Sequence, residues 1–97
     1  MTSQYLDNNF AEACFRQNSF AELTAALTEP ADQTDMANWG ITASEWLQQI
    51  EIARYAKIAD DFALWTEYFD TDGAMGEDEF DSLTLNAKIA LQLNAYH

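Results

Sequence analysis

The sequence predicts a mainly α fold, a small single-domain bundle of four to five helices in which residues 1–97 form one acidic helical domain. Three observations predict it. Hydrophobic residues make up 48% of the chain, which is enough for a core in spite of the high charge. Apolar residues recur at spacings near three and four, the period of a helix. Two Ser/Thr-x-x-Glu patterns are also present, and such patterns begin helices.

Two short helices are expected in the N-terminal part of the chain. The first is expected from Ser3, which can cap a helix, to about Arg16, because the apolar residues between them have helical spacing. Ser19 and Glu22 then form a capping-box pattern that predicts the start of a second helix. Pro30 is expected to end that helix, because proline cannot continue the backbone hydrogen-bond pattern.

The middle of the chain predicts a long helix. One turn of helix is expected to stop at Gly40, since glycine accepts the backbone conformation that ends helices. Residues 42–45 form a second capping box, and apolar residues then recur at helical spacing as far as Phe69. This helix is expected to run unbroken to Phe69 or to bend near residues 60–61.

The C-terminal segment, residues 83–95, fits two structures. It follows a loop that is expected at residues 71–76 because of two glycines. Apolar residues alternate with others from Leu83 to Leu93, which is the period of a strand. Its Ala, Leu, Lys and Gln residues favour a helix instead. We favour a helix buried on two sides, and a short β element, giving an α+β fold, is the alternative.

Tryptophan and tyrosine residues are candidates for the core and for a partner interface. Trp46 and Trp65 are expected in the core because of their helical spacing. Trp39 and Tyr55 are expected to be exposed, where such side chains often anchor protein interfaces.

Acidic residues outnumber basic ones by seventeen to four, and the formal net charge is -13. Such an excess destabilises a compact domain by self-repulsion, which indicates that it serves a basic partner surface. Basic surfaces of that extent belong mostly to proteins that bind nucleic acid. Nine acids lie between residues 60 and 81, where no Lys or Arg occurs, and we name this set the acidic cluster: Asp60, Asp61, Glu67, Asp70, Asp72, Glu77, Asp78, Glu79 and Asp81.

The acidic cluster is expected to form a partner-binding face that imitates the phosphates of duplex DNA. The simpler interpretation is a solvated face that only keeps the protein soluble. Solubility of a small domain needs a net charge of only about 2 to 8, however, and this chain exceeds that range. We therefore favour a binding role.

Residues 68–80 resemble a degenerate EF-hand calcium loop. Asp70, Asp72 and Glu79 occupy positions of metal ligands in that loop, and Gly73 falls at the required glycine. The first ligand position holds Tyr68 where calcium loops normally have Asp. A weak calcium site, or an acidic adaptor that binds a partner helix, is therefore the alternative function.

Several function classes are excluded or disfavoured by composition. The only histidine is His97, at the end of the chain, so neither a Ser-His-Asp triad nor a histidine-bearing zinc site is expected. We expect no enzyme, no cofactor and no small-molecule ligand. The negative charge also disfavours direct nucleic-acid binding and membrane binding. The single cysteine, Cys14, suits a reducing compartment, and we expect the cytoplasm of a bacterial host.

In its small size, its acidity and the acidic cluster between Asp60 and Asp81, the chain resembles the phage-encoded DNA mimics, which include anti-restriction and anti-CRISPR proteins. It is most similar to the acidic inhibitors of the type I-F CRISPR surveillance complex. The resemblance is one of class and rests on no shared motif. It implies a non-catalytic inhibitor that binds the basic DNA-recognition groove of that complex and blocks target DNA. An anti-restriction DNA mimic is the second possibility within the same class.

Overall fold

The computed structural model describes residues 9–28, 33–40 and 42–96. In these residues the fold is helical and contains no strand, which confirms the mainly α prediction. The elements, more numerous than the four to five expected, are α1 (Asn9–Gln17), α2 (Phe20–Thr28), α3 (Gln33–Trp39), α4 (Ala43–Asp60), α5 (Phe62–Tyr68), α6 (Glu77–Ser82) and α7 (Leu85–Tyr96).

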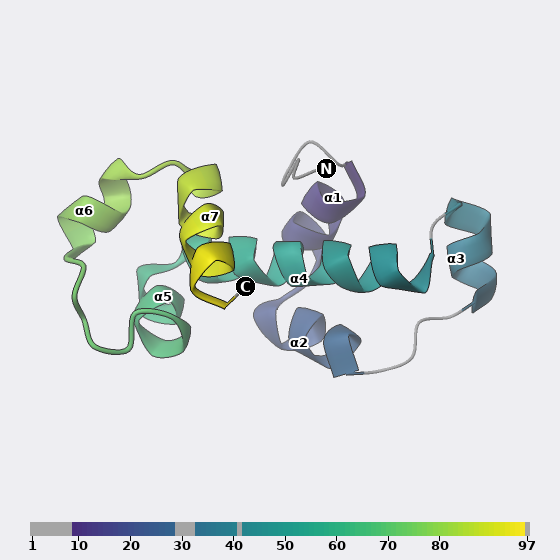
Figure 1. Cartoon of the computed structure of the whole chain (residues 1–97), viewed down its shortest axis with the longest axis horizontal. Coiled ribbons are helices and arrows are strands. Elements are labelled where there is room, and N and C mark those ends of the chain that lie inside the picture. Colours follow the sequence, from purple (N-terminus) through teal and green to yellow (C-terminus); the bar gives the residue numbers. More distant parts are fainter. Residues whose placement is uncertain (1–8, 29–32, 41, 97) are drawn as a thin grey trace.

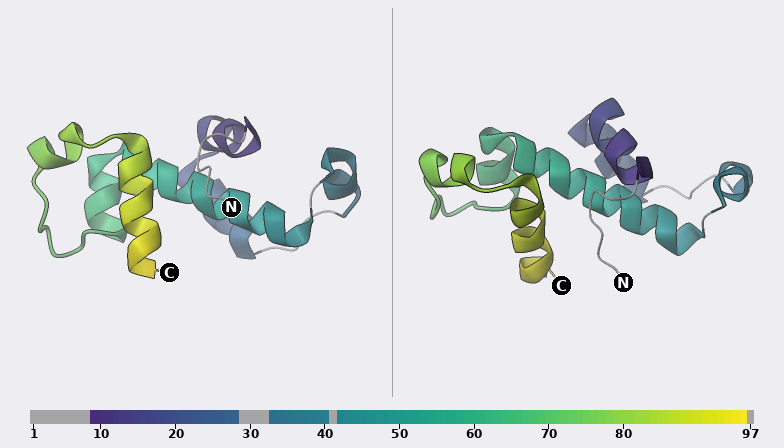
Figure 2. Two further views of the ribbon diagram at one scale, coloured as in Figure 1. Left: turned by 45° about the horizontal axis from the view of Figure 1, so that its top comes forward. Right: turned by 90° about the horizontal axis from the view of Figure 1, so that it is seen from above.

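The long helix α4 is the axis of the molecule (Figures 1 and 2). Helices α1 and α2 pack along its middle, α5 and α7 pack at its C-terminal end, and α3 touches only its N-terminal end. The molecule is elongated as a result, with extents of 44 × 25 × 24 Å. None of the described helices has both the length and the apolar character that crossing a bilayer requires.

Both predicted capping boxes are present. The Ser19 backbone N–H donates to Glu22 Oε1 at 2.7 Å, and the Glu22 N–H donates to Ser19 Oγ at 3.2 Å. Thr42 and Glu45 make the same reciprocal pair at 2.9 and 3.1 Å. Each box satisfies two N–H groups that the first turn of a helix leaves without helical partners. The expected cap at Ser3 and the expected stop at Pro30 lie outside the described residues.

The long predicted helix is divided at Asp61. This residue has extended backbone angles, ends α4 and begins α5, and its carboxylate accepts a hydrogen bond of 2.8 Å from the Ala63 N–H. Aspartate is a strong N-cap because its side chain satisfies such a free amide. The predicted bend is therefore a full break between two helices, and it adds one helix to the expected number.

In the described part of the chain, the core consists of three clusters that all include residues of α4. Leu23, Ile50 and Ala53 join α2 to α4, and a second cluster joins α4 to α7. The third cluster centres on Trp65, which is fully buried and contacts α6 through Phe80. Trp65 is thus a core residue, as predicted.

Tyr55 is a core residue as well, and its predicted exposure is wrong. Only 5% of its surface is accessible, because it lies on the face of α4 that receives α7. Its hydroxyl lies 3.4 Å from Glu51 Oε2. The Trp39 side chain lies outside the described residues.

Residues 85–96 form a helix, so the β alternative is wrong for this segment. The helix is buried on one side only, in contrast to the two-sided burial that we expected. Ile89 and Gln92 have no accessible surface, whereas Leu91 is 39% exposed. A polar residue thus holds a core position and an apolar one faces solvent. The burial of Gln92 is explained by its amide, because Nε2 donates a hydrogen bond to the Tyr55 carbonyl oxygen on α4 at 2.9 Å.

Candidate functional site

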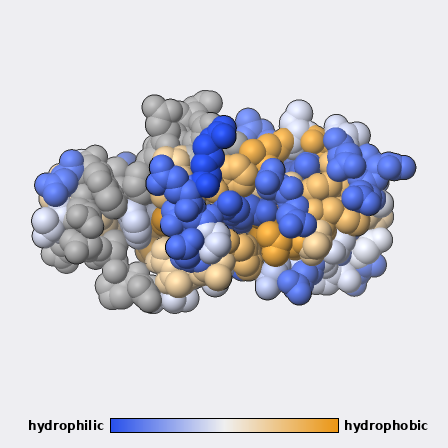
Figure 3. Space-filling model, turned by 180° about the vertical axis from the view of Figure 1, so that it is seen from behind, coloured by the Kyte–Doolittle hydropathy of each residue, from blue (hydrophilic) through white to orange (hydrophobic). Residues whose placement is uncertain are grey.

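The acidic cluster occupies the end of the molecule formed by the last residue of α4, helices α5 and α6, and the loop between them (Figure 1). Eight of its nine carboxylates belong to exposed residues, and Asp70 is half-buried. Figure 3 shows the same end from behind, at the right, where hydrophilic side chains gather. The structure therefore brings the predicted site residues to one end of the rod.

Asp70 organises the loop between α5 and α6. Its Oδ1 accepts a hydrogen bond from the Ala74 N–H at 3.1 Å, and its Oδ2 accepts one from the Met75 N–H at 2.9 Å. Its carbonyl oxygen accepts a further hydrogen bond from Gly73, whose φ of 67° lies in the left-handed region that glycine tolerates. Asp70 is thus a structural residue of the turn, as Asp61 is of the α5 cap.

The other seven members of the cluster are exposed and cap nothing. We name them the exposed acids: Asp60, Glu67, Asp72, Glu77, Asp78, Glu79 and Asp81. The Glu67 carboxylate accepts a hydrogen bond from the hydroxyl of the neighbouring Tyr68, and this bond raises the pKa of that phenol. These seven carboxylates are available to a partner without loss of a cap or a turn.

Helix α6 carries four of the exposed acids and is anchored by one aromatic side chain. Phe80 is 4% exposed, and its ring centroid lies 5.4 Å from that of Trp65 and 5.2 Å from that of Phe62. Three acids lie in the first turn of α6, where the positive end of the helix dipole stabilises them. The helix therefore presents carboxylates to solvent on one side and a single ring to the core on the other.

Lys88 is a residue of this region that the sequence analysis missed. It is buried, its Nζ lies 3.7 Å from the centroid of the Phe80 ring, and it donates to the Ala59 carbonyl oxygen at 3.2 Å. A cation there also interacts favourably with the C-terminal end of the α4 dipole. Lys88 thus connects α7 to the end of α4 and to α6 beneath the exposed acids.

Replacing Lys88 with Ala should destabilise the protein by about 1–3 kcal/mol. The change removes a charged hydrogen bond and a cation–π contact, while the relief of burying a charge offsets part of that loss. Urea unfolding measured by circular dichroism tests this, with Asn94→Ala on the exposed side of α7 as the control. Equal stability of the two variants would contradict a structural role for the buried cation.

The calcium ligands suggested by the sequence are not gathered into a site. The Asp70 carboxylate is occupied by two amides of its own loop. Among the described residues, no three side chains of Asp, Glu, Cys or His lie close enough together to hold a metal ion, and Asp70, Asp72 and Glu79 are all in that part of the chain. The resemblance to an EF-hand therefore extends to the glycine turn and the acidic composition, and not to a ligand cage.

Comparison with known proteins places this end of the chain in a family. The sequence model described as Anti-CRISPR protein F31 matches residues 52–97, which contain the whole acidic cluster. Among curated proteins, the chain is similar to Anti-CRISPR protein 31 of Pseudomonas phage D3112. The two are 45% identical over 42 residues, which are 43% of this chain and 81% of that protein. No solved structure matches the chain.

Proposed function

The chain belongs to the Anti-CRISPR protein F31 family, and we propose that it inhibits a type I-F CRISPR surveillance complex as a DNA mimic. Family membership gives the general function, which is inhibition of CRISPR immunity by a phage protein inside the bacterial host. The proposal adds the mechanism. The acidic end docks in the basic groove of the complex and excludes target DNA from it.

The observation that carries the proposal is the concentration of uncompensated carboxylates at one end of the rod. Residues 60–81 contain nine acids and no cation, and seven of these acids are exposed without capping a helix or a turn. Like charges so close together repel one another, and a partner rich in Lys and Arg relieves that repulsion. A DNA groove is such a partner, because it is built to neutralise phosphates.

Inhibition by this route requires binding and no catalysis. The inhibitor is proposed to act on the protein subunits of the complex and to make no contact with nucleic acid, which its charge repels. Residues 1–97 are proposed to act as one unit, since all three core clusters include residues of α4. The family match favours CRISPR machinery over restriction enzymes as the target class.

Competition with target DNA tests the mechanism. The apparent Kd of purified type I-F complex for a fluorescent duplex target should rise linearly with the inhibitor concentration and without a plateau, as expected for one shared site. The affinity of the inhibitor for the complex should fall by about ten-fold or more between 50 and 200 mM salt, because several ion pairs are screened together. Inhibition that leaves the affinity for the duplex unchanged would contradict the DNA-mimic mechanism.

A further inference from the structure

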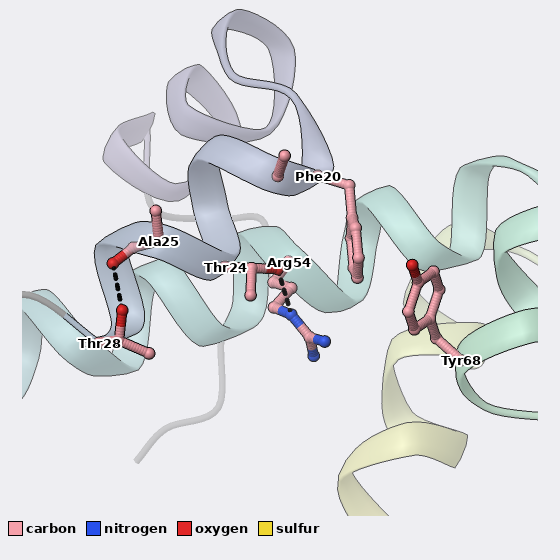
Figure 4. Close-up of a pocket in the computed structure, with 7 residues that line it drawn as sticks. Phe20, Thr24, Ala25, Thr28, Arg54 and Tyr68 are labelled. Atoms are coloured by element: carbon pink, nitrogen blue, oxygen red, sulfur yellow. Dashed lines mark hydrogen bonds between the residues drawn. The ribbon is translucent and has the colours of Figure 1, made fainter.

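A pocket of about 440 Å³ lies between α2, α4 and the end of α5 (Figure 4). Its walls are mainly apolar and include the rings of Phe20 and Tyr68, whose centroids are 4.5 Å apart. The volume falls within the range of sites that hold small groups. The pocket contains one charged side chain, Arg54.

Arg54 has hydrogen-bonding capacity left over in this pocket. Its Nε donates to Thr24 Oγ1 at 2.9 Å, and its guanidinium carbon lies 4.6 Å from the centroid of the Phe20 ring. These contacts fix the plane of the guanidinium group. Within the described part of the chain no carboxylate pairs with its two Nη groups, which Figure 4 shows directed away from α2. A guanidinium held in this way is suited to a planar, two-point contact with a carboxylate.

We propose that this pocket binds one aspartate or glutamate side chain of the protein partner. For the identity of that partner, the inference rests on the function proposed above. A single carboxylate fits the single guanidinium, and the aromatic rings offer apolar contacts to the rest of the side chain that carries it. A polyanion such as RNA is disfavoured, because the net charge of -13 repels it.

The pocket borders the acidic cluster. Tyr68, on its wall, follows Glu67 in the sequence and precedes Asp70 by two residues. A partner that receives the acidic end would therefore pass over the Arg54 pocket as well. Duplex DNA presents no guanidinium group to a carboxylate of the groove, so this contact distinguishes the complex of the groove with the inhibitor from its complex with DNA. Arg54 and Tyr68 belong to the part of the chain that matches the family, whereas α2 precedes it.

Removing the positive charge of Arg54 tests the proposal, because the two explanations predict opposite changes in the affinity for the complex. If Arg54 acted only through its charge, then Arg54→Met would make the inhibitor more negative and tighten its binding to a basic complex. If Arg54 holds a partner carboxylate, the same change should weaken binding by about 10- to 100-fold. Lys57→Met is the matched control. It lies one turn away on α4, changes the charge equally and is not in the pocket, because Lys57 Nζ lies over the Phe15 ring.

Affinity for purified type I-F complex should therefore fall for Arg54→Met and be unchanged or rise slightly for Lys57→Met. Arg54→Lys keeps the charge but loses the forked donor, so it should also weaken binding. This variant replaces Arg54→Met in the test if the Met variant fails to fold. Circular dichroism melts verify folding. Equal tightening by Arg54→Met and Lys57→Met, or full affinity of Arg54→Lys, would overturn the proposed carboxylate-binding role of the pocket. Neither result would contradict the DNA-mimic proposal.

A second arm needs no CRISPR complex. The probes are the blocked peptides acetyl-Leu-Asp-Leu-amide and acetyl-Leu-Asn-Leu-amide, titrated into ¹⁵N-labelled protein. The aspartate peptide should shift the Arg54 Nε–H resonance and the amide of Tyr68, with the asparagine peptide at least about ten-fold weaker. Failure of the wild-type protein to bind the complex would refute the proposed function. The peptide titration would then still show whether the pocket binds a carboxylate. Identical shifts with both peptides, or no shift at Arg54, would overturn the proposal that the pocket binds a carboxylate.

Discussion

Replacing the four acids of α6, Glu77, Asp78, Glu79 and Asp81, with their amides is expected to weaken inhibition by about 30- to 1,000-fold. All four are exposed, and their side chains make no cap or turn. Each exposed ion pair with a partner is worth about 0.5–1 kcal/mol, so four together contribute about 2–4 kcal/mol. The measurement is the inhibitor concentration that halves target-DNA binding by the purified complex.

The control for this experiment changes net charge equally at other positions. Asp7, Glu29, Asp32 and Asp35 lie outside the acidic cluster, and amides at these four positions raise the net charge by the same four units. If position matters, the control should retain nearly full inhibition. Equal losses in the two variants would show that total charge, and not the acidic end, is responsible. Circular dichroism must also show that α6 persists without its favourable first-turn charges.

Local signals in the sequence predicted the helix starts well. The capping boxes at Ser19 and Thr42 depend on residues three positions apart, and nothing distant competes with them. Gly40 and Gly73 take positive φ values at the end of a helix and in a turn, as their positions indicated. The break at Asp61 was only half visible, because an aspartate can lie on the surface of a helix as well as cap one.

Pairings over long sequence distances were not predictable. Lys88 and Gln92 are buried because their polar ends reach carbonyl oxygens of Ala59 and Tyr55 on α4, 29 and 37 residues away. In the sequence, both residues are only members of the set that alternates with the apolar residues, and nothing there indicates their burial. The structural role of Asp70 within the acidic cluster was hidden for a different reason, because its partners are local but composition does not separate a carboxylate that holds a turn from one that faces a partner.

Replacing Trp65 with Ala is expected to destabilise the protein by about 3–5 kcal/mol, the range for removing a fully buried aromatic side chain. A domain of this size has a total stability of about 5–15 kcal/mol, so much of it would be lost. The Trp65 ring packs between Phe69, at 4.7 Å between centroids, and Phe80, which anchors α6. Inhibition should fall in parallel with the folded fraction, because the exposed acids of α6 lose their anchor.

Trp65→Phe separates packing from polarity at the same position. The indole Nε1 of Trp65 is buried and has no hydrogen-bond partner in the described part of the structure. Phenylalanine leaves a smaller cavity than alanine and also removes this unsatisfied donor, whose burial costs about 1–3 kcal/mol. Trp65→Phe should therefore lower the free energy of unfolding by only about 0–2 kcal/mol, and inhibition should be retained. Urea unfolding of both variants measures the difference, and a Phe variant as unstable as the Ala variant would mean that the indole ring makes contacts that no smaller ring can replace.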